Sequence, residues 1–145
     1  MRKQLLRWEA AGFLFVAAAG TLLHFVYDWS GGSPLAAAFS AVNESTWEHM
    51  KLFFFPFFLF SVVQLWFVGR NYPNFLAVRT VSVLVGLVLI PVLFYTYSGV
   101  LGDTVDWVNI AIFYVAVLAA FLLDVRLLSR GRMAALWQQI GRAHV

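Results

Sequence analysis

Two segments of the sequence bring together histidines and carboxylates, the side chains that most often bind divalent metals or transfer protons. His24 and Asp28 are four residues apart in an apolar stretch, so on a helix their side chains lie on one face. Glu44, Glu48 and His49 follow in a second, more polar segment. Neutral imidazole nitrogens and carboxylate oxygens suit a divalent metal such as zinc. The sequence therefore predicts a histidine and carboxylate site built from both segments.

Within this site, the predicted metal ligands are His24, Asp28 and His49. Glu48 or Glu44 is the predicted general base, which would activate a metal-bound water. The sequence contains no His-Glu-x-x-His motif, and the adjacent Glu48 and His49 point about 100° apart on a helix. The metal hypothesis thus rests on residue types. It requires the two imidazoles to lie within about 8 Å, because zinc–nitrogen bonds are only about 2 Å long.

The same residues could also have purely structural roles. Ser45 and Glu48 fit a capping box, in which each side chain accepts a backbone N–H bond at the start of a helix. Glu48 and Lys51 are three residues apart and fit an ion pair on a helix. His24, inside an apolar run, fits a hydrogen bond across a helix pair. The residue pattern is compatible with a structural role and with a metal site.

Membrane-spanning helices have to position these residues. The chain has 145 residues, of which 62% are hydrophobic and 12% charged, and its mean hydropathy is +0.81. Soluble domains carry roughly 25% charged residues, so the excess apolar surface has to face lipid. Four segments have the roughly 17–25 residues of a helical span: approximately 8–28, 44–68, 75–98 and 105–123. We predict an all-α, four-span transmembrane helical bundle, forming a single membrane domain over residues 1–139.

The connection between the first two spans is predicted to contain a further short helix. Ser33 fits its N-cap and Pro34 its first helical position. The Ala-rich stretch 35–42 is too short to cross the membrane. An interfacial or re-entrant helix between spans one and two is therefore expected.

Basic residues gather on one side of the predicted spans, which is the pattern of cytoplasmic loops. They precede the first span, flank the turn between the second and third, and follow the fourth: Arg2, Lys3, Arg7, Arg70, Arg79, Arg126, Arg130 and Arg132. The opposite side holds only Lys51. This asymmetry predicts a cytoplasmic N-terminus in the cytoplasmic membrane. The net charge of +3 is then a topology signal, and nucleic acid is not an expected partner.

Two further expectations concern the C-terminal region. Asp124 is expected to pair with Arg126 or Arg130, which follow it closely. Residues 140–145, Ile-Gly-Arg-Ala-His-Val, resemble translated sequencing-adapter DNA. We therefore expect a truncated chain, in which residues 133–139 begin a fifth span that is missing.

The segments 24–30 and 43–51 resemble an uncharacterised family of small bacterial multi-pass membrane proteins, a domain of unknown function. The most specific part is the block Asn-Glu-Ser-x-Trp-Glu-His, which starts at Asn43. The resemblance covers most of the chain to about Arg132. It implies a bacterial cytoplasmic membrane and further sequence in complete members, and it implies no activity. A weaker similarity is to intramembrane zinc hydrolases of the ceramidase type, whose His-x-x-x-His element is absent here.

Three functional classes follow from these observations. In the first, the His and carboxylate cluster serves binding or helix assembly, with the lipid bilayer and a protein partner or second copy as contacts. The alternative is a metal-dependent intramembrane hydrolase. The second alternative is an ion or proton transporter component, which fits less well because the polar groups gather at one membrane face and transport sites usually lie near the midplane. With no cysteines, thiolate metal sites and disulfides are excluded.

Overall fold

The computed structural model describes residues 2–130, whose regular secondary structure is entirely helical. Within them, each of the four long helices is long and apolar enough to cross a membrane: α1 (Arg2–Trp29), α3 (Thr46–Phe67), α4 (Phe75–Leu101) and α5 (Asp106–Arg130). The short helix α2 (Pro34–Phe39) lies between α1 and α3, and the 3₁₀ turn η1 (Gly69–Asn71) lies between α3 and α4. These elements confirm the predicted four-span architecture and the short extra helix. The predicted fifth span and the adapter-like residues 140–145 lie outside the described residues.

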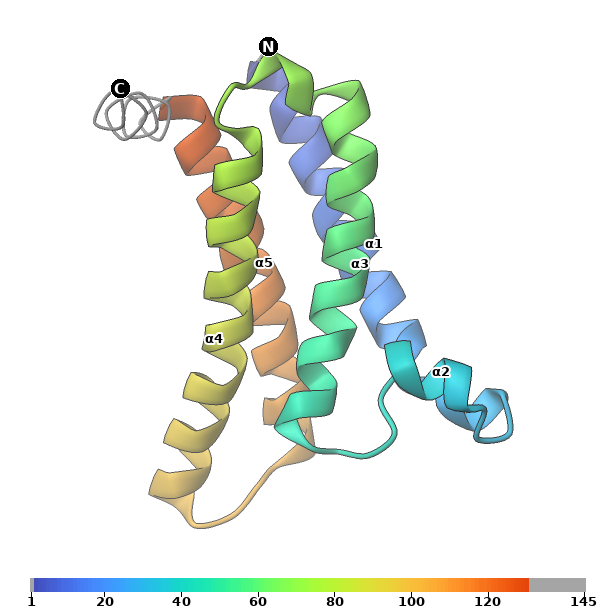
Figure 1. Ribbon diagram of the computed structural model, residues 1–145. Coiled ribbons are helices and arrows are strands. Elements are labelled where there is room, and N and C mark those ends of the chain that lie inside the picture. Colours follow the sequence, from blue (N-terminus) through green and yellow to red (C-terminus); the bar gives the residue numbers. More distant parts are fainter. Residues whose placement is uncertain (1, 131–145) are drawn as a thin grey trace, which may run out of the picture.

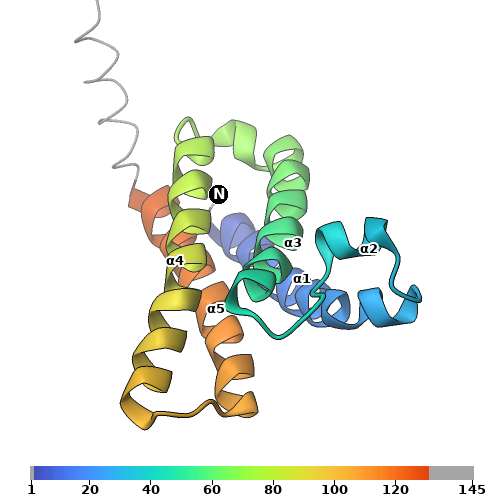
Figure 2. The ribbon, with the colours of Figure 1, turned by 60° about the horizontal axis from the view of Figure 1, so that its bottom comes forward.

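The long helices form a ring in which each packs on two neighbours. α1 packs on α3 and α5, and α4 packs on the same two helices. The start of α1, the α3–α4 turn and the end of α5 lie together at the top of Figure 1. We call this end of the bundle, marked by Arg2 and Arg70, the proximal end. The opposite end, marked by Trp29 and Asp106, is the distal end; there the α4–α5 hairpin diverges from α1 and α2 in both views (Figures 1 and 2).

Local hydrogen bonds explain where α3 begins. The Ser45 side chain accepts a bond from the Glu48 N–H at 3.3 Å, which confirms the predicted N-cap. In a complete capping box the Glu48 carboxylate would also accept from the Ser45 N–H, but other groups make these bonds here. Asn43 Oδ1 accepts from the Ser45 N–H at 2.9 Å, and the Glu48 carboxylate instead accepts from the Val42 N–H at 3.0 Å. Glu48 thereby fixes the connection that precedes α3.

The interior is filled by aromatic rings, and glycines make room for them. Phe53, Phe57 and Phe121 are almost fully buried. A side-chain carbon at Gly12 would collide with the ring of Phe121, and one at Gly86 with the ring of Phe53. Because membrane helices gain stability mainly from close packing, these glycines set how tightly the helices approach.

A polar network crosses the interior near the proximal end and takes one side chain from each long helix. Arg79 on α4 forms ion pairs with Glu9 on α1, at 3.3 Å, and with Asp124 on α5. Gln64 on α3 donates from Nε2 to Glu9 Oε1 at 2.8 Å. We call these four residues the buried ion network; none is more than 4% exposed. Pairing of this kind is what allows charged side chains to lie inside a membrane bundle.

The predicted pairing of Asp124 with Arg126 is wrong, and the side chain of Arg130, the other predicted partner, lies outside the described part of the structure. Asp124 points into the bundle and pairs with Arg79, which lies 45 residues earlier. Arg126 is exposed, because residues two apart on a helix point about 200° apart. Arg79, one of the basic residues that flank the α3–α4 turn, is thus also a contact between helices.

Gly20 on α1 offers a test of this packing. Its substitution Gly20→Ala would place a Cβ against the Phe113 ring and 2.7 Å from the Leu52 carbonyl oxygen. We expect the free energy of unfolding in detergent to fall by about 1–3 kcal/mol, as is typical of overpacking. Denaturant unfolding followed by circular dichroism measures this change.

The matched control is Gly99→Ala, which is also within a long helix but has no atom within 4 Å of its added Cβ. It should leave stability unchanged or raise it slightly, because alanine favours helices more than glycine does. Equal effects of the two substitutions would contradict the close approach of α1 and α3 at Gly20.

Candidate functional site

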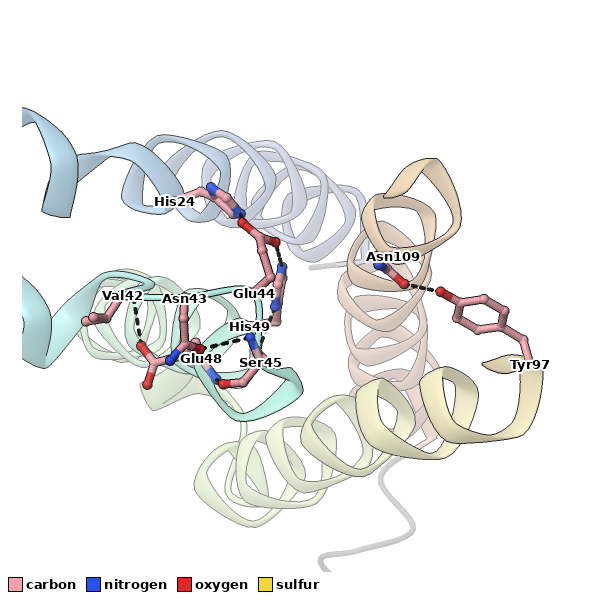
Figure 3. A network of polar contacts seen from close by, with 9 residues as sticks. All are labelled: His24, Val42, Asn43, Glu44, Ser45, Glu48, His49, Tyr97 and Asn109. Atoms are coloured by element: carbon pink, nitrogen blue, oxygen red, sulfur yellow. Dashed lines mark hydrogen bonds and ion pairs between the residues drawn. The ribbon is translucent and has the colours of Figure 1, made fainter. Parts of the chain in front are cut away.

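Two histidines and one glutamate from separate parts of the chain meet at the distal end. His24 lies on α1, Glu44 in the connection that leads to α3, and His49 in the first turn of α3. Glu44 lies between the two imidazoles, with Oε1 3.3 Å from His24 Nε2 and Oε2 3.6 Å from His49 Nε2 (Figure 3). One ligand atom from each residue lies within 4.8 Å of the others. We call these three residues the His–Glu cluster.

The His–Glu cluster is accessible from outside the protein. The side chain of His49 is 16% exposed, that of His24 31% and that of Glu44 76%. A cavity of about 420 Å³ adjoins the cluster, and its lining includes residues of α1, α3 and α5. The polar side chains that line it, besides the cluster itself, are Thr21, Asp106, Asn109 and Tyr114. A small ligand or a water molecule can therefore reach the cluster.

The ring of His49 is held in a defined orientation. Its Nδ1 lies 2.9 Å from the carbonyl oxygen of Ser45. A carbonyl oxygen only accepts, so Nδ1 carries the hydrogen and donates it. In the neutral ring, Nε2 is then left with its lone pair directed to the Glu44 side of the site. Metal-binding histidines in proteins are commonly oriented by such a bond from the other ring nitrogen.

The connection that carries Glu44 is held by the start of α3. Lys51 Nζ lies 2.6 Å from Glu48 Oε2 and donates to the Ala37 carbonyl oxygen of α2 at 2.8 Å. The Glu48 carboxylate in turn accepts from the Val42 N–H. The predicted Glu48–Lys51 ion pair is therefore confirmed. Together these bonds tie α2 and the following residues to α3, and this places Glu44 over the two histidines.

The structure brings together only part of the predicted site. His24 and His49 lie well within the 8 Å required for a shared zinc, and Glu44, predicted as a general base, lies between them. Asp28, predicted as a ligand, is exposed and makes no ion pair or side-chain hydrogen bond with any of residues 2–130. It lies one turn beyond His24, about 6 Å further along the helix axis. Glu48 is engaged by Lys51 and the backbone, as described above.

Among the polar residues that line the cavity, the sequence reasoning missed Tyr114. Tyr114 on α5 shares a hydrogen bond of 2.8 Å with Thr21 on α1, which joins the two helices beside the cavity. Asp106, Ile110 and Tyr114 follow one another at four-residue intervals and all line the cavity. This spacing places the three residues on one helix face, and it is the sequence signal that could have placed Tyr114 beside Asp106.

Elsewhere at the distal end, a separate contact closes the α4–α5 hairpin. The Tyr97 hydroxyl donates to Asn109 Oδ1 and accepts from the Val105 N–H at 3.3 Å. Figure 3 shows this pair apart from the His–Glu cluster. It holds Asn109 on the cavity side of α5.

Comparison with known proteins gives one match. The model of a family of unknown function, DUF6512, matches residues 1–141. No curated protein and no solved structure matches the chain.

Proposed function

The chain belongs to the family of unknown function DUF6512, and we propose that it binds a divalent transition-metal ion through His24, Glu44 and His49. Zinc suits this ligand set best, since two imidazoles and one carboxylate are a common three-ligand zinc site. The observation that carries the proposal is the convergence of three ligand atoms within 4.8 Å.

The distances fit a metal site as well as ion pairs between Glu44 and the two imidazoles. With metal–ligand bonds of about 2.0–2.1 Å, the ligand atoms of a tetrahedral zinc site lie about 3.3 Å apart. The His24–Glu44 distance of 3.3 Å already has this value, and the other separations, all within 4.8 Å, have to close by at most roughly 1.5 Å. Glu44 is highly exposed and lies in a connection, so its carboxylate can rotate toward a bound metal.

A metal at this place would also serve helix assembly. His24 belongs to α1 and His49 to α3, so one ion bound to both cross-links these helices at the distal end. Three protein ligands leave a coordination position for water or for a ligand in the adjacent cavity. Binding and assembly are thus two consequences of the same site.

The orientation of the protein is part of this proposal. The proximal end carries Arg2, Lys3, Arg7 and Arg70, which supports a cytoplasmic location for that end in a bacterial cytoplasmic membrane. The His–Glu cluster then faces the extracytoplasmic side. The metal would be taken from outside the cell.

A second candidate function is metal-dependent hydrolysis within the membrane surface. The cavity beside the cluster favours it, because a metal-bound water would face a space of about 420 Å³. Glu44 serves as a ligand in this arrangement, and Glu48 is engaged by Lys51. Asp106, which lines the same cavity, is then the general base.

Zinc binding is tested by competition with a fluorescent chelator on the purified protein in detergent. We expect one zinc per chain. The substitutions His24→Ala, Glu44→Ala and His49→Ala should each weaken binding by roughly 100-fold or more, because a lost ligand costs more than the 10–100-fold typical of its supporting partners.

The control is Asp28→Ala, which removes the sequence-predicted ligand that lies outside the cluster and should leave zinc affinity unchanged. Substoichiometric zinc, or equal affinities for all four variants and the unmodified chain, would overturn the proposal.

Cysteine labelling tests the orientation. The sequence has no cysteine of its own, so only the introduced cysteine reacts. Asn71→Cys lies at the proximal end and Thr104→Cys at the distal end, and both positions are exposed. In intact cells a membrane-impermeant maleimide should label only Thr104→Cys, and both variants should be labelled after permeabilisation. The opposite pattern in intact cells would reverse the proposed orientation.

Hydrolysis is tested by mixing the zinc-loaded protein with vesicles that contain ester-linked and amide-linked lipids. Mass spectrometry should detect cleaved lipid. Asp106→Asn should slow cleavage by roughly 10²–10⁴-fold, the usual contribution of a general base, with zinc affinity unchanged. Absence of cleavage, or cleavage that persists in zinc-free His49→Ala protein, would remove this candidate and leave the metal site itself untouched.

A further inference from the structure

The buried ion network at the proximal end has an imbalance of charge. The carboxylates of Glu9 and Asp124 both face the single guanidinium of Arg79. Gln64 and Ser82, which lie beside these carboxylates, are uncharged. Among the side chains of residues 2–129, the charged groups that act on Asp124 are Arg79 and Glu9. With both carboxylates ionised, the network has a net charge of −1.

The surroundings make this excess negative charge unfavourable. The rings of Phe57, Phe75 and Phe121 have their centroids 5.0, 5.4 and 5.2 Å from Cζ of Arg79. The negative faces of aromatic rings stabilise a cation and disfavour an anion. An uncompensated charge inside a membrane bundle is also costly. Arg79 therefore stays charged, and the network is left short of one positive charge.

The hydrogen bonds show where that charge can be added. Glu9 accepts from Gln64 Nε2 at 2.8 Å and from Arg79 Nη2 at 3.3 Å. Asp124 accepts from Arg79 through Oδ2, while its Oδ1 is buried and has no ion-pair partner among the side chains of residues 2–129. The fully buried Ser82 hydroxyl adjoins this carboxyl group. A hydrogen on Oδ1 would turn this acceptor into a donor directed to Ser82.

We propose that the buried ion network is a proton-binding site, which holds one exchangeable proton on Oδ1 of Asp124 with Ser82 Oγ as its acceptor. Glu9 stays ionised as the partner of Arg79. The proton makes the network neutral. An anion is not favoured, because the net charge before proton uptake is already negative. The site lies at the opposite end from the His–Glu cluster and does not depend on the metal proposal.

Infrared spectroscopy of the full chain in detergent at neutral pH tests this proposal. A protonated carboxyl group has a carbonyl stretch that shifts on exchange into D₂O, whereas ionised carboxylates lack it. We expect this band in the unmodified protein, a frequency shift with Ser82→Ala, and its loss with Asp124→Asn. Glu9→Gln should also abolish it, because Asp124 then has to ionise to neutralise Arg79.

Two further variants serve as controls for the assignment of the band. Arg79→Gln should strengthen the band, since both carboxyl groups would then be protonated. Glu44→Gln, at the other end of the bundle, should not change it. Circular dichroism confirms folding of each variant; Glu9→Gln and Asp124→Asn each retain one carboxylate for Arg79 and should fold.

The proposal is overturned if the unmodified protein lacks the band, or if the band survives Asp124→Asn or Glu9→Gln. Absence of the band together with an unfolding midpoint that rises with sodium, but not with choline, would assign the missing charge to a bound sodium ion in place of the proton.

Discussion

The polar contacts between α1 and α3 are the constraint on which the arrangement of this bundle depends. His24 follows Glu9 by fifteen residues on α1, and Gln64 follows His49 by fifteen residues on α3. Because these helices are antiparallel neighbours, the Glu9–Gln64 bond at the proximal end and the histidine pair at the distal end are in the same register, about 22 Å apart. A polar bond inside lipid tolerates little sliding or rotation, since an unpaired group there is costly. The network thus determines which faces of α1 and α3 meet at the distal end.

The two ends of the bundle differ because their contacts differ. At the proximal end, the buried ion network takes a side chain from every long helix, which draws the helices together around Arg79. At the distal end, the α4–α5 hairpin is closed by its own Tyr97–Asn109 bond and diverges from α1. The resulting cavity leaves the His–Glu cluster accessible. The proximal end is thus closed by contacts among all four long helices, and the distal end is open.

The sequence was sufficient to predict the spans, the capping residue Ser45 and the meeting of His24 with His49, because each depends on hydropathy or on local spacing. It did not predict that Glu44, and not Asp28, joins the histidines. Helical periodicity places Asp28 on the face of His24, but the position of Glu44 depends on how the connection is tied down by Glu48, and spacing carries no such information. Periodicity also says nothing about partners on other helices, which is why Asp124 was assigned to nearby arginines and Glu9 was overlooked.

In the function that we propose, these contacts align two imidazoles and one carboxylate to hold a metal ion. X-ray absorption spectroscopy at the zinc edge, on zinc-loaded protein in detergent, tests this alignment most directly because it reports the ligands themselves. We predict two imidazole ligands per zinc, with zinc–nitrogen distances of about 2.0–2.1 Å, and additional oxygen ligands at about 2.0–2.2 Å. A spectrum with one imidazole or none, as for zinc held by surface carboxylates and water, would contradict the proposed site.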